Sequence, residues 1–297
     1  MRALAAPASL KGALSAADAA DALAHGLSAG GAVADALAVA DGGDGTLDVL
    51  ERALFSSRRS TTVTAPLGGE VVAEWLLLDD GTAVVESAQA LGFATVDRLD
   101  PLRASSRGLG ELILAATGEA DALLVCLGGT VTVDGGAGMR EVLDELPLPT
   151  RVACDVLSPL LDAVHVFGAQ KGATPEQLPV LAERLRRLPD ARGSGAAGGL
   201  GGAFLSLGAT LVPGAKLVLD LIGFDPRGYE LVVTGEGAVD ATTYVGKAPG
   251  EVVKRCDAAG VRYHLFSARD DFSGDPAQAR EDLVALGRRL GGARGSG

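Results

Sequence analysis

Carboxylates lie between glycines in three separate loops of this chain, and each loop follows an apolar run. The first loop carries Asp41, the second carries Asp134, and the third carries Glu236 and Asp240. Carboxylates hold divalent cations or accept a proton from a hydroxyl, and glycines let backbone N–H groups approach an anion. Three such loops predict that several strand ends face one crevice, which is where ligands bind in open α/β sheets.

The loop around Asp134 shows this pattern most fully. Residues 122–127 form a continuous apolar run, which is typical of a buried parallel strand, and the run breaks into glycines at 128–129 and again at 135–136. Backbone N–H groups at such turns, and at the start of the next helix, make a site for anions. A tight strand-to-helix turn with nothing bound explains this one loop equally well. The recurrence of the pattern is what favours a binding site.

A fourth glycine-rich stretch, residues 193–200, matches the GxGxxG pattern of dinucleotide-binding proteins, with Asp220 near the spacing of a ribose-binding acid. That pattern requires a strand immediately before it, and residues 185–192 are charged and interrupted by a proline. The context therefore argues against a nicotinamide or flavin site. A glycine-rich helix start close to a phosphate agrees better with the sequence.

The composition is that of a globular protein with an acidic surface. The 297 residues are 47% hydrophobic and 22% charged, and the net charge is −12. This charge argues against nucleic acid or an anionic membrane as the main partner. The three cysteines, Cys126, Cys154 and Cys256, cannot all pair and lie among apolar residues, which predicts buried thiols and a cytoplasmic protein. No apolar stretch is long enough to span a bilayer, and no signal peptide is expected.

Lysine is rare in this chain and tends to stand beside glycine. Only five of the 26 basic residues are lysines, and three of the five, Lys11, Lys171 and Lys247, adjoin a glycine. A compact ammonium at a glycine turn would suit a phosphate group. With five lysines to count, chance explains the pattern as well.

The order of predicted elements indicates two α/β domains. Residues 2–7, 16–27, 33–40 and 47–54 read as strand, helix, strand and helix, which is the opening of a parallel doubly wound sheet. From residue 61 the pattern changes to β-rich runs separated by Gly-Gly and Asp-Gly turns, which predicts an antiparallel meander that ends at Glu86. We therefore expect one domain from residues 1–60 and 225–297, and a second α/β domain inserted at 61–224. Further strands are expected at 122–127, 152–156, 231–234 and 262–266, and further helices at 109–116, 139–143, 177–188, 246–258 and 277–290.

Taken together, the loops resemble those of the bacterial glycerate kinases, the glycerate 2-kinase family. The motifs that carry the resemblance appear in the order APASLKG, ADGGDGT, DPLRASSRG, LGGTVTVDGGAGM, FGAQKGA and TGEGAVDATTYVGKAP, between about residues 5 and 268. The resemblance implies ATP-dependent phosphorylation of D-glycerate and favours the hydroxyl at position two. It also implies a flavodoxin-like domain built from both chain ends, with a second α/β domain inserted.

This resemblance gives the candidate residues provisional roles in phosphoryl transfer, which depends mostly on positioning and charge neutralisation. Lys11, Lys171 and Lys247 would neutralise phosphate oxygens or the substrate carboxylate. Either Asp41 or Asp134 would accept the proton of the substrate hydroxyl, and the sequence does not choose between them. Mg²⁺ would be held by some of Asp134, Asp155, Glu236 and Asp240, with Glu236 also close to the nucleotide. Backbone donors to phosphates would come from Gly128, Gly129, Thr130, Gly135, Gly136, Gly195 and Gly198.

Several positions depart from the pattern of the family that the chain resembles. The family usually has an acid at the position of Ala8, asparagine at Val133, arginine at Ala238, and glutamate where Asp44 stands, and the chain is short after residue 268. Two alternatives therefore stay open. One is a non-catalytic relative that binds a small acid or a nucleotide, and the other is a kinase for a different small hydroxy acid.

Overall fold

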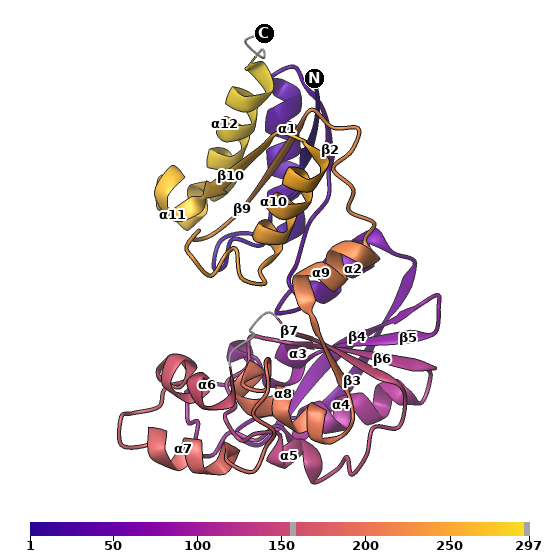
Figure 1. Ribbon diagram of the computed structural model, residues 1–297, viewed down its shortest axis with the longest axis vertical. Coiled ribbons are helices and arrows are strands. Elements are labelled where there is room, and N and C mark those ends of the chain that lie inside the picture. The colour runs from indigo at the N-terminus through magenta and orange to yellow at the C-terminus, as the bar shows by residue number, and fades with distance from the viewer. Residues whose placement is uncertain (155–158, 294–297) are drawn as a thin grey trace. The chain divides into compact units, whose positions relative to one another are not determined.

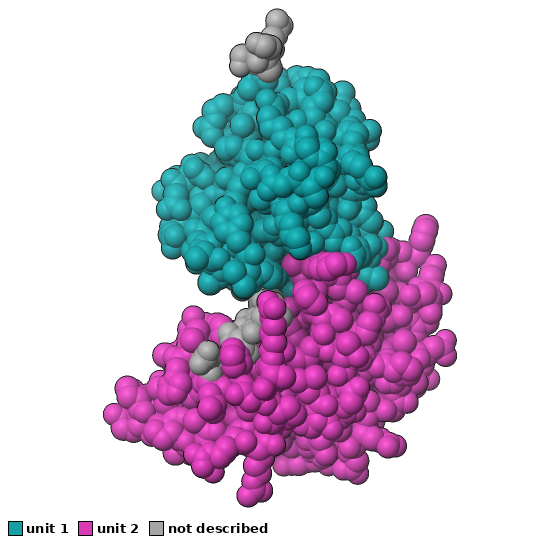
Figure 2. Space-filling view, in the orientation of Figure 1, with its two compact units in different colours: residues 1–41, 48–53, 218–297 teal, residues 42–47, 54–217 magenta. Residues whose placement is uncertain are grey.

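The computed structural model describes residues 1–154 and 159–293, and the chain divides into two compact units (Figure 2). Unit 1 consists of Met1–Asp41, Asp48–Ala53 and Val218–Gly297, and unit 2 consists of Gly42–Leu47 and Leu54–Leu217. The sequence predicts divisions near residues 60 and 224. Strand β3 (Ser56–Thr64) pairs along its whole length with β4 (Glu70–Leu78), so residues 56–60 form part of the sheet of unit 2.

Unit 1 contains a parallel sheet of four strands in the order β10-β9-β1-β2. The strands are β1 (Arg2–Ala5), β2 (Val33–Ala36), β9 (Leu231–Glu236) and β10 (Tyr263–Ser267). Strand β1 pairs with β2 on one side and with β9 on the other, so the two ends of the chain share one sheet. This confirms the predicted parallel α/β domain formed by both chain ends.

Helices cover both faces of this sheet because its strands are apolar on both faces. Ala3 and Ala5 pack in one cluster with helices α1 (Ala16–Ala29) and α12 (Ala279–Gly292), which lie side by side (Figure 1). Leu4 and Ala6 pack in a second cluster with α10 (Ala248–Ala259) and the end of α9 (Gly214–Leu221). The smaller helices of this unit are α11 (Ala268–Asp271) and η3 (Pro276–Gln278).

Helix α1 begins where the sequence predicted. The side chain of Ser15 accepts a hydrogen bond from the backbone N–H of Asp18 at 3.0 Å, which satisfies one of the donors that a helix N-terminus leaves unpaired. The contact between α1 and α12 depends on glycine. A Cβ atom built on Gly291 would lie 2.2 Å from the carbonyl oxygen of Leu27, and one on Gly26 would lie 2.3 Å from that of Val284. The two helix backbones therefore touch directly.

Unit 2 contains a mixed sheet of six strands in the order β3-β4-β5-β6-β7-β8. Strands β3, β4 and β5 (Thr82–Glu86) form the predicted antiparallel meander. Strands β5, β6 (Ala122–Leu127), β7 (Thr150–Cys154) and β8 (Thr210–Pro213) are parallel. The sequence analysis did not predict β8, which is short and has no fully buried residue. The carboxyl ends of β5, β6 and β7 thus meet at one edge of the sheet.

The main core of unit 2 lies between one face of this sheet and its helices. Trp75, Val85 and Val125 pack there against Leu112 of α4 (Arg107–Thr117) and Phe204 of α8 (Ala196–Ser206). A smaller cluster joins α6 (Leu160–Phe167) to α7 (Leu178–Leu185). The remaining helices are α2 (Thr46–Ala53), which begins in unit 2 and continues into unit 1, α3 (Ser87–Leu91), η1 (Phe93–Thr95), α5 (Ala137–Arg140) and η2 (Ala169–Lys171). Among the described residues, no helix is long and apolar enough to cross a membrane.

Candidate active site

The carboxyl end of β6 forms a tight glycine turn in unit 2. A Cβ atom built on Gly128 would lie 2.7 Å from the Cα atom of Gly43, so this residue must be glycine for the loop 42–47 to approach so closely. The hydroxyl of Ser87 donates to the carbonyl oxygen of Gly128 and accepts from its N–H, both at 3.1 Å. Gly129 follows with a φ of +65°. The predicted glycine turn therefore lies against the loop 42–47, which follows Asp41 in the chain.

Lys171 is a buried cation that is bound to this turn. Its side chain comes from η2 and is only 7% exposed. The ammonium donates to the hydroxyl of Thr130 at 3.1 Å and to the carbonyl oxygen of Thr132 at 2.8 Å. Within the described part of the chain, the buried hydroxyl of Thr132 has no hydrogen-bond partner. The structure thus brings two of the predicted nucleotide-binding residues, Thr130 and Lys171, into direct contact.

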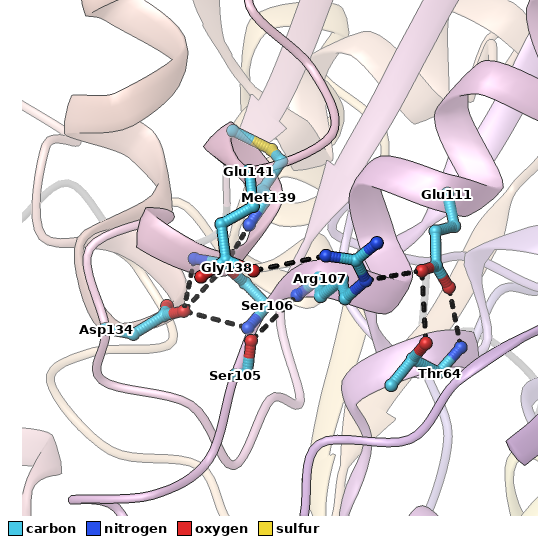
Figure 3. Close-up of polar contacts among 9 residues, drawn as sticks. All are labelled: Thr64, Ser105, Ser106, Arg107, Glu111, Asp134, Gly138, Met139 and Glu141. Carbon is cyan, nitrogen blue, oxygen red and sulfur yellow. Dashed lines mark hydrogen bonds and ion pairs between the residues drawn. The ribbon is translucent and has the colours of Figure 1, made fainter. Parts of the chain in front are cut away.

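Asp134 accepts hydrogen bonds from four donors, and Figure 3 shows those from Ser106 and Gly138. The backbone N–H and the hydroxyl of Ser106 both donate to Oδ2 at 2.8 Å. The N–H groups of Gly136 and Gly138 donate at 3.1 Å to Oδ1 and Oδ2 respectively. The hydroxyl of Ser106 in turn accepts from the N–H of Met139 at 2.9 Å. Asp134 therefore fixes the start of α4 to the start of α5.

Next to this cluster, Arg107 contacts two carboxylates of unit 2, one within its own helix α4 and one after α5 (Figure 3). Its guanidinium donates to Glu111 at 2.8 Å and to Glu141 at 3.2 Å. Glu111 also accepts from the N–H of Thr64 at 2.7 Å and from its hydroxyl at 3.1 Å. Burial raises the pKa of Glu111, but the hydrogen bonds from Thr64 and Arg107 outweigh it and leave that pKa below its ordinary value. These contacts tie α4 to the end of β3.

Three of the glycines predicted to contact phosphates lie in crowded surroundings. A Cβ atom on Gly136 would lie 2.5 Å from the Cβ of Ala203, one on Gly135 would lie 2.8 Å from Leu185, and one on Gly198 would lie 2.0 Å from the carbonyl oxygen of Thr132. Ala197 and Gly198 both have a positive φ within α8. A fourth predicted glycine, Gly195, is the residue immediately before that helix. Close packing within unit 2 accounts for Gly135, Gly136 and Gly198, and phosphate binding at all four positions stays a prediction.

In unit 1, Glu236 and Lys247 form an ion pair at the end of β9. The ammonium of Lys247 lies 3.4 Å from Oε2 of Glu236, and the hydroxyl of Thr243 donates to Oε1 at 2.6 Å. The side chain of Glu236 is 14% exposed and that of Lys247 is 29% exposed. Lys247 is also the residue immediately before α10. The loop between β9 and α10 therefore holds one cation and one carboxylate at the edge of the sheet.

Asp240 lies in the same loop and is exposed. Its Oδ1 accepts from the N–H of Thr242 at 2.8 Å and from the hydroxyl of Thr242. The hydroxyl of Thr242, then its N–H, and the nearby Lys247 lower the pKa of Asp240. The carboxylate is thus ionised at neutral pH.

Lys11 and Asp41 lie at this same edge of unit 1. Lys11 is in the loop after β1, and a Cβ atom on Gly237 would lie 4.0 Å from its backbone nitrogen. After β2, the N–H of Leu37 donates to the carbonyl oxygen of Ala5 at 2.8 Å. The N–H of Val39 donates to the carbonyl oxygen of Pro7 at 3.2 Å. The segment that leads to Asp41 therefore runs beside the segment that leads to Lys11. Since β1 lies between β2 and β9, the carboxyl edge of unit 1 carries Lys11, Asp41, Glu236 and Lys247.

The predicted metal ligands are only partly described. Asp155 lies outside the described residues. Within residues 1–154 and 159–293, no group of three or more histidine, cysteine, aspartate or glutamate side chains could hold a metal ion. The three cysteines are buried, and burial with the charge of Asp257 raises the pKa of Cys256 to about 12. A thiolate nucleophile is therefore not expected at Cys256.

One buried carboxylate at this edge of unit 2 was not among the predicted site residues. Glu86 is fully buried at the end of β5. The sequence signal was an acidic residue placed directly after an apolar strand, which is also the usual composition of an exposed strand end. Only the parallel pairing of β5 with β6 puts Glu86 beside the glycine turn.

The chain matches the model of the glycerate kinase family over residues 3–148 and 146–282. The chain belongs to the glycerate kinase family. It is 37% identical over 310 residues to the glycerate kinase of Bacillus subtilis (strain 168), covering 86% of this chain and 81% of that protein. It is 35% identical over 265 residues to the glycerate 2-kinase of Escherichia coli (strain K12), covering 71% of this chain and 70% of that protein.

A solved structure shares this fold. The crystal structure of a protein designated glycerate kinase 2 from Salmonella typhimurium LT2 superposes with a TM-score of 0.77 at 30% sequence identity. The match covers 98% of this chain and 97% of that one. Membership of the glycerate kinase family confirms the predicted fold class and the predicted ATP-dependent kinase.

One departure from the pattern of the glycerate kinase family has a structural explanation. Val133 is 2% exposed and packs with Leu160, Val164, Leu181 and Leu185. Its side chain completes the apolar contact between α6 and α7. An apolar residue there is consistent with core packing and does not indicate a lost catalytic group.

Proposed function

We propose that this chain transfers the γ-phosphoryl group of ATP to the 2-hydroxyl of D-glycerate. The observation that carries the proposal is the family match over residues 3–148 and 146–282. The relatives named glycerate kinase and glycerate 2-kinase supply the substrate and the position of transfer. Such a reaction needs cations near anionic oxygens and carboxylates near a hydroxyl, and the described residues include candidates for both roles.

Asp41 is the better of the two candidates for the base. The oxygens of Asp134 accept four hydrogen bonds, so the carboxylate could reach a substrate or a metal only by giving up contacts that hold α4 to α5. Asp41 lies on the carboxyl edge of unit 1, which also carries Lys11, Glu236 and Lys247. We therefore assign proton acceptance from the substrate hydroxyl to Asp41 and a structural role to Asp134.

The lysines supply the positive charge that an acidic chain needs for anionic substrates. Lys247 would neutralise a phosphate oxygen or the carboxylate of glycerate, because its partner Glu236 lies at 3.4 Å and is not a tight contact. Lys11 is exposed in the neighbouring loop and would act in the same way. Lys171 is buried and would order the turn at Thr130, where backbone donors at Gly128 and Gly129 would meet phosphates.

The residues of unit 1 are suited to Mg²⁺. Mg²⁺ binds to proteins through one or two carboxylates and keeps water and phosphate oxygens as its other ligands, so a cluster of three carboxylates is not required. Asp240 is exposed and ionised, and the two hydrogen bonds that it accepts from Thr242 both go to Oδ1. Asp240 and Glu236 would hold the cation. When bound, Mg²⁺ would neutralise charge on the phosphate oxygens.

An assay of ADP release tests this function. We expect turnover with D-glycerate and Mg-ATP, no turnover without D-glycerate, and a product that phosphorus NMR identifies as 2-phosphoglycerate. A panel of small hydroxy acids, including L-glycerate, tests the alternative of another substrate. If the protein bound ATP and D-glycerate but released no ADP, the catalytic proposal would be wrong and the chain would be a binding protein.

A further inference from the structure

Glu86 is a buried carboxylate that receives two backbone N–H groups from a distant loop. It is the last residue of β5 and is fully buried. The N–H of Gly45 donates to Oε1 at 3.0 Å, and the N–H of Leu47 donates to Oε2 at 3.1 Å. These donors lie at the start of α2, where a helix leaves its N–H groups unpaired and favours negative charge. The two bonds offset part of the cost of burying the carboxylate.

The segment that Glu86 holds is the glycine–aspartate loop 42–47. Within it, the hydroxyl of Thr46, which is fully buried, donates to the carbonyl oxygen of Gly43 at 2.7 Å. The Cα atom of Gly43 lies 2.7 Å from where a Cβ atom on Gly128 would be, and the Cβ of Asp44 lies 3.1 Å from where one on Gly129 would be. The loop 42–47 thus lies directly against the glycine turn 128–129.

The next residue along the chain holds the other side of this contact. Ser87 exchanges two hydrogen bonds with the backbone of Gly128, one as donor and one as acceptor. Two consecutive side chains at the end of β5 therefore hold two loops, Glu86 the loop 42–47 and Ser87 the turn 128–129. Neither residue was predicted to be part of the site.

We propose that Glu86 is a positioning residue of the kinase, which fixes the loop 42–47 against the glycine turn so that their backbone donors are in place before a triphosphate binds. The inference rests on the proposed function, because it assumes that these loops bind the phosphates of ATP. A binding site whose backbone donors are already in place loses less conformational entropy when the ligand binds. Small displacements of groups that position a substrate also have large effects on the reaction rate. Removing the carboxylate should therefore affect catalysis more than folding.

The test compares Glu86→Gln with Glu111→Gln. Both positions are partly or fully buried carboxylates of unit 2 that accept backbone N–H groups, but Glu111 holds α4 to β3. In Glu86→Gln, the amide nitrogen faces one of the two N–H donors and cannot accept from it. We expect kcat/KM for ATP to fall by about 10²-fold, with Glu86→Asp recovering part of the loss, whereas Glu111→Gln should stay within about twofold of the parent protein.

Hydrogen exchange of the parent protein and the variants separates the two proposals. We expect faster exchange at the amides of Gly45 and Leu47 in Glu86→Gln and no change there in Glu111→Gln. Faster exchange with unchanged kcat and KM would overturn the inference and leave the kinase function intact. A parent protein that holds these amides but does not phosphorylate D-glycerate would refute the proposed function instead. If Glu86→Gln does not fold, Glu86→Asp carries the same comparison, because it keeps the charge and withdraws the oxygens by one methylene.

Discussion

Asp134 illustrates what a single residue reveals in sequence and what it reveals in structure. Its type and its glycine neighbours indicated a base or a metal ligand. In the folded chain, two of its four donors come from Ser106, 28 residues earlier, and two come from N–H groups just after it. Sequence spacing shows the two local donors but not the remote pair. These hydrogen bonds make Asp134 a structural link in unit 2, and its role as a base or a metal ligand stays a prediction.

The first prediction concerns Asp134→Asn. An amide nitrogen would face N–H donors, so we expect the free energy of unfolding to fall by about 1–3 kcal/mol. Turnover should fall with it, because α4 and α5 would lose their common anchor. Chemical denaturation gives the stability change, and a double-mutant cycle with Ser106→Ala should show that the two changes are not additive. Full stability with lost turnover would instead identify Asp134 as the base.

The second prediction concerns Lys247, for which helix α10 supplies a matched control. Lys247 lies 3.4 Å from Glu236, and Lys254 lies 3.4 Å from Glu251 on the same helix, but Lys254 is 75% exposed. We expect Lys247→Ala to lower kcat/KM by about 10²–10³-fold, as the loss of a charge-stabilising group does. Lys254→Ala should change it little, because exposed ion pairs contribute little. Equal kinetics in the two variants would remove Lys247 from the site.

At the scale of elements, helices that contact one another through glycine are sensitive to a single methyl group. Gly291 and Gly292 are neighbours in α12, so the gain in helix propensity on changing either to alanine is similar. A Cβ on Gly291 would lie 2.2 Å from the carbonyl oxygen of Leu27, whereas one on Gly292 would lie 3.5 Å from that of Gly30. The first distance is an overlap and the second is an ordinary contact.

The third prediction follows from this pair. Gly291→Ala must push α12 away from α1, and such overpacking costs about 1–3 kcal/mol. Gly292→Ala should be neutral or slightly stabilising. Thermal denaturation of both variants measures the difference in their stability. Hydrogen exchange of Gly291→Ala should be faster at the amides in the strands of unit 1. Equal melting temperatures would mean that the two helices are not held in this contact.

The fourth prediction concerns pH and the link between α4 and β3. The pKa of Glu111 is lowered from its ordinary value of 4.5, so the folded protein binds this proton less readily than the unfolded chain. The ionised Glu111 therefore stabilises the folded protein at pH values above 4.5, and this stabilisation is lost as the pH falls through the lowered pKa. Glu111→Gln should flatten the acid limb of a curve of stability against pH. An unchanged acid limb would show that Glu111 does not contribute to it.

Element types were predictable in this chain where the apolar pattern was long. Strand β6 has the bounds 122–127 that its apolar run indicated, and α1 begins after Ser15 as its capping pattern indicated. Helix α8 could not be predicted in its actual form. Ala197, Gly198 and Gly199 have positive φ inside it, and the close approach of Gly198 to the carbonyl oxygen of Thr132 requires a glycine there. That requirement arises from a segment more than sixty residues earlier and leaves no local signal other than glycine.

At the scale of the whole molecule, the two units differ in how the chain builds them. All six strands of unit 2 lie between Leu54 and Leu217. The sheet of unit 1 needs both ends of the chain, and the N–H of Arg2 bonds to Glu230, 228 residues away. Contacts between distant residues form slowly, because the closure of a long loop costs entropy.

The fifth prediction is an order of refolding. We expect amides of β5 and β6 to become protected before those of β1 and β9, because the pairing of β1 with β9 closes the longer loop. Pulse-labelling hydrogen exchange after dilution from denaturant measures this order. Simultaneous protection of both sheets would indicate that the units fold as one cooperative body.

The position of β1 between β2 and β9 has a consequence for biosynthesis. During synthesis, residues 1–41 leave the ribosome long before Leu231 does. Strand β1 therefore lacks its partner strand β9 while the inserted unit is translated. The face of β1 that packs against α9 and α10 stays uncovered during that interval, whereas α1 is already available for the other face. We expect molecular chaperones that capture nascent chains to bind residues 1–41, and to release them only when β9 and α10 have been synthesised.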